Sequence, residues 1–205
     1  MCAILATFSL YEEQGGGTES GASVFKVDYF GRPSFLAQSP QLGKQMAIAA
    51  DFERVYEIGP VFRAENSNTH RHLTEFTGMD LEMTIEEDYH EVVDMLDNAL
   101  KSIFRGLQSE YRRELDTVRK YYPSEDLVFP EKTLKLHFAD GVKLLNESGW
   151  KDNDQPVDPY EDFSTATERR LGQLVKEKFG TDYYILDKFP LDARPFYSTQ
   201  LFALM

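Results

Sequence analysis

The segments Phe62-Arg63-Ala64-Glu65 and Arg71-His72-Leu73-Thr74-Glu75-Phe76, the second running on through Asp80 to Glu82, decide the fold of this chain. A polar loop separates the two segments, so we expect two neighbouring strands joined as a hairpin. Successive side chains of a strand point to opposite faces. The hairpin therefore sorts its residues into two sets.

Alternation places charged and aromatic residues on one face and apolar residues on the other. The first set is Arg63, Glu65, Phe76, Gly78, Asp80 and Glu82, and the second is Phe62, Ala64, Thr77, Met79, Leu81 and Met83. We predict that the second face is packed as a core and that the first face is a site.

The charged face has the residue types that bind a nucleotide. Arg63 can hold a phosphate with paired donors, each charge-assisted bond contributing about 1.5 to 3 kcal/mol. Phe76 offers a ring on which a base can stack, and Gly78 leaves room for a ligand. A plain hairpin with exposed ion pairs, contributing about 0 to 1 kcal/mol each, is the lesser alternative, because an ordered set of this kind is unusual on a solvated face. The polar loop at 66–72 adds an Arg and two His for outer phosphates.

These residues resemble motif 2 of the class II aminoacyl-tRNA synthetases, in the subgroup of the aspartate, asparagine and lysine enzymes. Further segments are similar to the aspartyl-tRNA synthetases of the eukaryotic and archaeal type. These segments are Gly21–Phe25, Leu36–Leu42, Lys44–Met46, Phe189–Leu191 and Arg194–Tyr197. The resemblance covers residues 18–197 and implies an aspartate-tRNA ligase, which activates aspartate with ATP and transfers it to tRNA(Asp).

The resemblance also implies the role of each matching residue. For aspartate these are Glu19, Gln41, Lys44, Arg63 and Asp80; for ATP, Arg63, Glu65, Arg71, His72, Leu73 and Phe76; for the tRNA acceptor end, Ser67 and Thr69. Arg63 is the expected catalytic residue. Ser39 and Pro40 are typical of a helix start, with Leu42, Met46 and Ala49 or Ala50 on one side, so we expect Lys44 near a helix N-terminus that favours an acidic substrate.

Substrates and partners follow from the same resemblance. We expect ATP as substrate, Mg²⁺ with ligands largely outside this chain, no metal site within it, and a cytoplasmic location. The family forms homodimers, but motif 1, which builds that interface, is not recognisable here. We therefore expect residues 1–17 to be an atypical segment, 18–197 a partial catalytic domain and 198–205 an atypical tail.

Three functional hypotheses stay open from the sequence. The first is a catalytic-domain piece of an aspartate-tRNA ligase, weak or inactive alone, because motif 3 and further cations of the family are missing. The second keeps the scaffold as a nucleotide- or amino-acid-binding or interaction module without turnover. The third is an asparagine-tRNA ligase. Lysine is disfavoured as substrate, because its ammonium would meet Lys44.

Composition limits the remaining possibilities. The chain has 205 residues, which favours one domain, and a net charge of -13, which argues against a free-standing nucleic-acid binder. A single cysteine, Cys2, excludes an intrachain disulfide. No stretch approaches the ~20 apolar residues of a membrane span. The element pattern predicts an α+β fold with a largely antiparallel sheet flanked by helices.

The second half of the chain predicts ordinary packing elements. We expect strands at residues 1–10, 133–138 and 183–186, and helices after Glu86, before Gly149 and from Thr165 to Gly180. In the helix after Glu86, a stripe including Val93, Leu96, Leu100, Ile103 and Leu107 predicts core packing. His90 and His137 lack metal-ligand spacing, and Trp150 is expected to be a packing residue.

Overall fold

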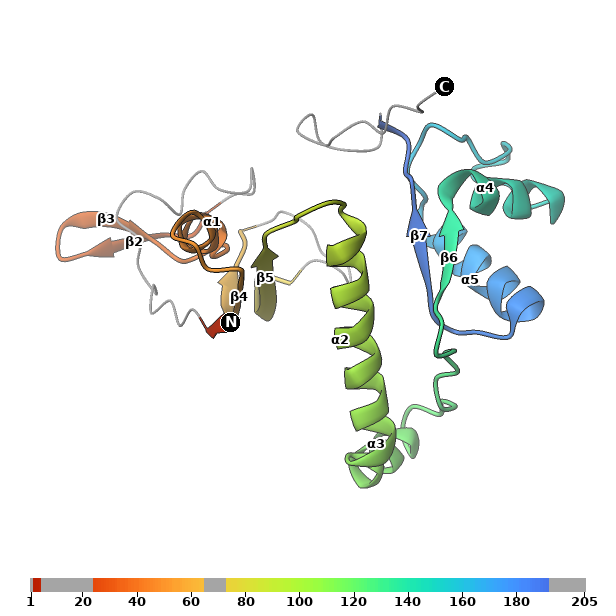
Figure 1. The fold of residues 1–205 in the computed structure, drawn as a ribbon, viewed down its shortest axis with the longest axis horizontal. Helices are drawn as coiled ribbons and strands as arrows, with labels where there is room; N and C mark the ends of the chain where they lie inside the picture. Colours follow the sequence, from red (N-terminus) through yellow and green to blue (C-terminus); the bar gives the residue numbers. More distant parts are fainter. Residues whose placement is uncertain (1, 5–23, 65–72, 192–205) are drawn as a thin grey trace. The chain divides into compact units, whose positions relative to one another are not determined.

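The computed structural model describes residues 2–4, 24–64 and 73–191, and Figure 1 shows their course. The chain divides into two compact units, Met1–Val93 and Asp94–Met205. Its length had favoured a single domain, so that prediction is not met. The elements are β1 Cys2–Ile4, β2 Lys26–Tyr29, β3 Arg32–Phe35, α1 Gln41–Ala49, β4 Arg54–Phe62, β5 Glu75–Met83, α2 His90–Ser109, α3 Arg112–Arg119, β6 Leu134–His137, α4 Phe138–Glu147, α5 Thr165–Phe179 and β7 Tyr184–Asp187.

The first unit is built around the β4–β5 hairpin that the sequence predicted. The two strands are antiparallel along their whole length, with Val61 opposite Phe76 and Glu57 opposite Asp80. Beyond the last paired residue, the backbone N–H of Arg63 donates to the carbonyl of Thr74 at 3.0 Å. Directly paired residues share a face, so the alternation predicted from the sequence is confirmed. β1 extends the sheet by pairing in parallel with β4.

The assignment of the packed face was only partly right. The expected core face is half-buried at Phe62, Leu81 and Met83 but open at its centre, where Met79 is 56% and its neighbour Ile58 61% exposed. The fully buried residues, Val55 and Val61, lie on the charged face. Helix α1 contacts both strands, and its Lys44 binds two carboxylates on the charged face. The helix therefore covers the charged face, and the apolar face has no comparable cover among the described residues.

Helix α1 also differs in detail from its prediction. Its N-cap is Pro40, without a side-chain cap, so Ser39 is one residue too early for the predicted capping role. The predicted apolar side is exposed at Leu42 and Met46. The side of the helix that carries Lys44 faces the sheet instead, because the ammonium of Lys44 contacts Asp80 on β5.

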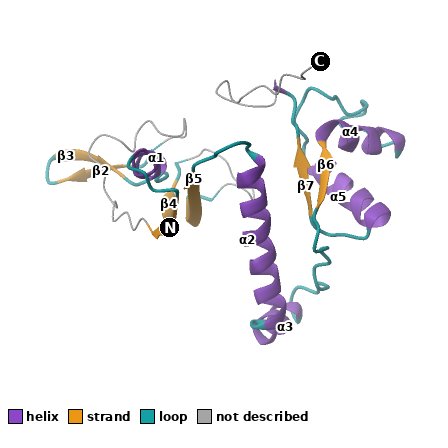
Figure 2. Ribbon diagram, in the orientation of Figure 1, coloured by secondary structure: helices purple, strands orange, loops and turns teal. Residues whose placement is uncertain are grey.

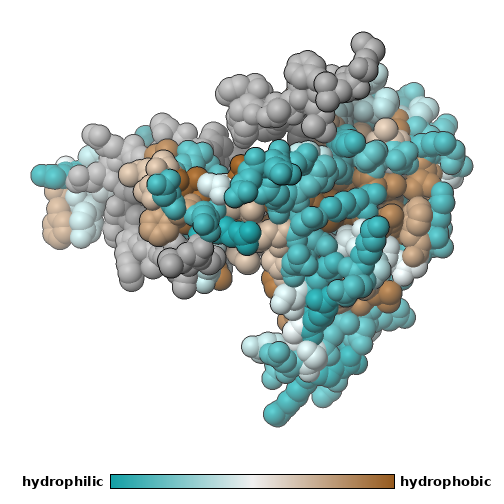
Figure 3. All heavy atoms as spheres, in the orientation of Figure 1, coloured by the Kyte–Doolittle hydropathy of each residue, from teal (hydrophilic) through white to brown (hydrophobic). Residues whose placement is uncertain are grey.

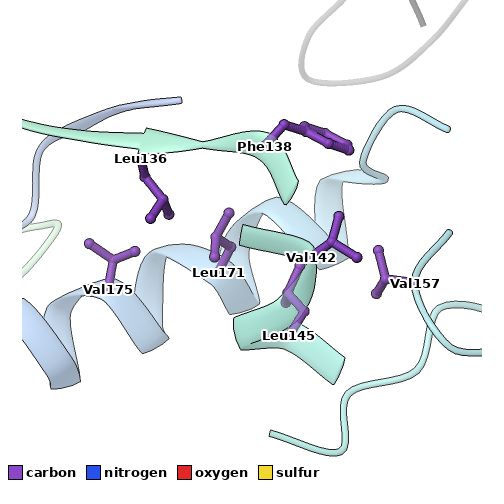
Figure 4. Packing of buried hydrophobic residues seen from close by; sticks show 7 residues of the cluster. All are labelled: Leu136, Phe138, Val142, Leu145, Val157, Leu171 and Val175. Carbon is purple, nitrogen blue, oxygen red and sulfur yellow. The ribbon is translucent and has the colours of Figure 1, made fainter. Parts of the chain in front are cut away.

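The second unit has the larger apolar core of the described chain. Leu136 and Phe138 from the β6–α4 junction pack against residues of α4, α5 and one loop, as Figure 4 shows. The remaining core residues are Val142, Leu145, Val157, Leu171 and Val175. Trp150 packs against this core and donates its indole N–H to Thr167, so its assignment as a packing residue is confirmed.

Helix α2 has the predicted extent of a long amphipathic helix but not the predicted burial. Leu96, Leu100, Ile103 and Leu107 are exposed, so the prediction that this stripe is core was wrong. The buried residues of the helix are Asp97 and Lys101. These charges can be buried because they pair with each other and with Thr133. The apolar stripe then lies on a neighbouring side of the helix, which stays exposed.

Of the remaining elements, α5, β6 and β7 lie where the sequence predicted them, whereas β2, β3 and α3 were not predicted (Figure 2). Helix α5 begins at Thr165, as expected, and its N-cap is Ser164, whose side chain accepts a hydrogen bond from the N–H of Thr167. Gly180 ends the helix at φ 69°, as expected. β6 and β7 pair in parallel, and β2 and β3 form an antiparallel hairpin. The α+β class is confirmed, with strand pairs divided among three small sheets.

Hydrophilic side chains are unevenly distributed over the face of the molecule shown in Figure 3. In Figure 3 hydrophilic residues predominate over α3 in the lower part of the view. Within the described residues, no helix has both the length and the apolar character needed to cross a bilayer.

Candidate functional site

Arg63 and Phe76 lie together on the charged face of the hairpin. The guanidinium carbon of Arg63 is 5.5 Å from the centroid of the Phe76 ring. The Nε of Arg63 is buried and has no hydrogen-bond partner. A buried donor without a partner costs about 1 to 3 kcal/mol, so this arrangement is better explained by a ligand oxygen than by packing alone. The prediction that these two residues share one face of the hairpin is confirmed, and their role in binding a nucleotide stays a prediction.

A side chain is excluded at position 78 for a different reason from the one expected. A Cβ added at this position would lie 2.7 Å from Cγ2 of Val61, which is closer than real side chains approach. Val61 is buried on the same face. The space above Gly78 is therefore filled by the protein's own side chain, and the expected room for a ligand is not found there.

Lys44 is the centre of a second group of charges on this face. Its ammonium pairs with Asp80, lies 3.2 Å from Oε2 of Glu82 and donates to the carbonyl of Leu81 at 3.3 Å. Burial is the largest influence on its pKa and lowers it, but hydrogen bonds and charges from Asp80 and Glu82 together outweigh burial and raise the pKa of Lys44. The side chain is therefore a fixed cation at neutral pH.

Glu82 is the residue that the site prediction missed. The alternation already placed it on the charged face, two residues after Asp80. A β-strand brings residues i and i+2 side by side, so a lysine that reaches one of them can reach both. The signal was present in the sequence, but nothing in it showed that Lys44 would cross from its helix to β5.

The other predicted site residues differ in how far the structure describes them. Gln41 is the first residue of α1 and is partly buried, one turn before Lys44. Leu73 precedes β5 and is exposed. The predicted residues Glu19, Glu65, Ser67, Thr69, Arg71 and His72 lie outside the described residues.

The arrangement can bind an anion and a flat ring at one place and an amino acid at another. Arg63 and Phe76 suit a phosphate and a base, and Lys44 with its carboxylates suits a charged amino acid. In the described part of the chain, no group of three or more His, Cys, Asp or Glu side chains is placed to hold a metal ion. His90 instead lies beside Asp88, with Nδ1 2.5 Å from the carboxylate.

Comparison with known proteins places these features in a family. The family model described as tRNA synthetases class II (D, K and N) matches residues 11–203. The chain belongs to this family of class II tRNA synthetases. The β4–β5 hairpin and its charged face lie within the matched residues.

Curated relatives of this class II chain include several aspartate-tRNA ligases. The cytoplasmic aspartate-tRNA ligase of Rattus norvegicus is 53% identical over 181 residues, covering 88% of this chain and 35% of that protein. The cytoplasmic aspartate-tRNA ligase 1 of Dictyostelium discoideum is 54% identical, covering 88% of this chain and 31% of that protein. The chain therefore spans about a third of the length of the curated relatives it matches.

Solved structures of class II synthetases share the fold. The aspartyl-tRNA synthetase of Entamoeba histolytica matches with a TM-score of 0.71 and 50% identity, covering 80% of this chain and 32% of that one. The asparaginyl-tRNA synthetase of Pyrococcus horikoshii complexed with asparaginyl-adenylate matches with a TM-score of 0.61 and 26% identity, covering 80% and 36%. Sequence identity is thus about twice as high to the aspartyl as to the asparaginyl structure.

Proposed function

We propose that this chain carries the amino-acid- and ATP-binding part of an aspartate-tRNA ligase. The observation that carries the proposal is the Arg63–Phe76 pair with its unbonded Nε, on the same strand face as the Lys44 group. The identity of more than 50% to curated aspartate-tRNA ligases supports aspartate as the substrate. ATP, tRNA(Asp) and a cytoplasmic location belong to the same proposal.

The chemistry requires alignment and charge neutralisation. A carboxylate oxygen of aspartate attacks the α-phosphorus of ATP, the bond to the bridging oxygen breaks, and pyrophosphate leaves. A carboxylate is already a nucleophile at neutral pH, so no general base is needed in this step. A ribose hydroxyl of the tRNA then attacks the mixed anhydride, and AMP leaves.

Arg63 has the main part in the first step. Its guanidinium binds the α-phosphate with two parallel donors and offsets the charge that develops during transfer. Phe76 fixes the adenine, which sets the position of the phosphate relative to Arg63. Mg²⁺ would supply further neutralisation of the phosphate charge; among the described residues, no group of three or more His, Cys, Asp or Glu side chains is placed to hold it.

Pyrophosphate exchange tests the proposal directly. Purified chain is incubated with ATP, labelled pyrophosphate and one amino acid at a time. Aspartate-dependent exchange that is lost in the Arg63→Lys variant and kept in the Arg54→Lys variant supports it, because Arg54 is exposed at the start of β4. Exchange that occurs with asparagine and not with aspartate would show that asparagine is the substrate.

A second candidate is a binding module without turnover. The chain covers about a third of its curated relatives' length, so groups that complete the reaction in those proteins can lie outside it. This candidate predicts that ATP and aspartate bind while exchange stays at background. Both candidates require that ATP and aspartate bind, so a chain that fails to bind either one would contradict both.

A further inference from the structure

The ammonium of Lys44 is already fully occupied in this structure. A lysine has three N–H donors, and three acceptors surround this one: Asp80, Oε2 of Glu82 at 3.2 Å and the carbonyl of Leu81 at 3.3 Å. The Lys44 side chain is 12% exposed, while the two carboxylates are about a third exposed. A further carboxylate can bind this cation only by displacing one of the three acceptors.

The group also carries a formal charge of the wrong sign for an acidic ligand. One ammonium and two carboxylates sum to one negative charge. An aspartate side chain that approaches Lys44 is therefore repelled by at least one neighbouring carboxylate, while an asparagine side chain is not. The outcome depends on which acceptor gives way.

Glu82 is the acceptor that can give way. The carbonyl of Leu81 belongs to the backbone of β5, and Asp80 is the closer of the two acidic partners. Glu82 lies farther from the ammonium, has a longer and more flexible side chain and is partly open to water. Its release from Lys44 costs the least.

We propose that Glu82 competes with the acidic side chain of the amino acid for Lys44 and so lowers the affinity for aspartate relative to asparagine. This inference rests on the proposed function, since it assumes that aspartate binds at this site. Glu82 holds the lysine in the empty site and yields it to the substrate. It acts through Lys44 and is a positioning residue with no part in the reaction itself.

The test uses the Glu82→Gln variant, which keeps shape and an acceptor oxygen but removes the competing charge. Equilibrium dialysis with labelled aspartate and, separately, labelled asparagine measures both Kd values. We expect aspartate to bind about three- to fivefold more tightly to the variant, the range for a partly exposed ion pair. Asparagine binding is expected to stay within about twofold, because an uncharged side chain does not compete for the cation.

The ratio of the two affinities separates this role from a merely structural one. If Glu82 only stabilises the hairpin, its loss weakens aspartate and asparagine binding together. The matched control is Glu75→Gln on the same strand, whose side chain points to the other face. This control is expected to leave both Kd values unchanged.

The possible results also separate this inference from the proposed function. Aspartate binding by the unaltered chain that is unchanged or weaker in Glu82→Gln overturns the role of Glu82 alone. Absence of aspartate binding by both proteins overturns the proposed function and this inference with it. Unfolding in urea, measured on the same samples, shows that each variant is folded.

Discussion

Replacing Lys101 by Met is expected to destabilise the second unit strongly. Lys101 on α2 pairs with Asp97 at 2.8 Å and donates to the carbonyl of Glu131 at 2.8 Å and to the hydroxyl of Thr133 at 3.0 Å. Both members of the pair are buried, with Lys101 4% and Asp97 8% exposed. Methionine fills a similar volume but leaves Asp97 as a buried charge without a cation. Such a loss costs about 3 to 5 kcal/mol.

The assay is urea unfolding at pH 7.5, followed by circular dichroism. The matched control is Lys135→Met, because Lys135 also pairs with an aspartate of α2, Asp94, at a similar distance. The Lys135–Asp94 distance is 2.7 Å and the Lys101–Asp97 distance 2.8 Å, but the first pair is exposed. That change should cost about 0 to 1 kcal/mol. Equal losses for the two variants, or a loss below about 1 kcal/mol for Lys101→Met, would refute the reasoning from burial.

The stability that is lost in Lys101→Met should depend on pH, and the pKa of Asp97 gives the direction. Burial raises the pKa of Asp97, but hydrogen bonds from Lys101, Thr133 and Tyr183 outweigh it and lower the pKa. A lowered pKa contributes stability above the unfolded value of about 3.9 and loses it as the pH falls through the folded value. Without Lys101, burial dominates and Asp97 takes up a proton more readily. The difference between the two proteins should therefore shrink from pH 7 to pH 4.

Three further predictions concern single positions. Gly78→Ala should cost about 1 to 3 kcal/mol of unfolding free energy because its Cβ would overlap a buried valine, while Gly106→Ala in α2, with open space around it, should stabilise by about 0.5 to 1 kcal/mol; equal effects in urea unfolding would contradict this. Ser164→Ala should cost about 1 kcal/mol through the lost N-cap of α5, measured by the same unfolding, and an unchanged midpoint would speak against the cap. Burial and the neighbouring Asp97 raise the pKa of Tyr183 to about 12, so absorbance titration of Tyr183→Phe against the parent should lose a phenol that ionises near that value; loss of one that ionises near 10 would contradict the burial.

The sequence predicts the hairpin well because a hairpin is determined by residues that are close together in the sequence. Two alternating segments around a polar loop define the pairing, and the register then puts Arg63 and Phe76 on one face. Gly180 likewise ends α5 at a positive φ, a conformation that glycine adopts without strain. Capping positions are less certain, because adjacent residues such as Ser164 and Thr165 are both good caps, and the difference depends on geometry.

The packed faces could not be predicted, because they depend on contacts between distant segments. The apolar stripe of α2 and the apolar face of β4–β5 both have the pattern of a core, yet Leu100 and Met79 are exposed. Conversely, Asp97 and Lys101 have the i, i+4 spacing of an ordinary surface pair, but Thr133, far along the chain, completes a buried network with them. The apolar periodicity alone therefore gave the wrong side of the helix.

The most direct test of the central claim measures how tightly ATP binds to the chain and to its Arg63→Lys variant. Lysine keeps the charge but lacks the paired donors, and the lost charge-assisted bond is worth about 1.5 to 3 kcal/mol, or roughly ten- to a hundredfold in Kd. The account predicts a loss in this range, with Phe76→Leu also weakening binding by at least about fivefold. Unchanged ATP affinity in both variants would show that the nucleotide does not bind between these two side chains.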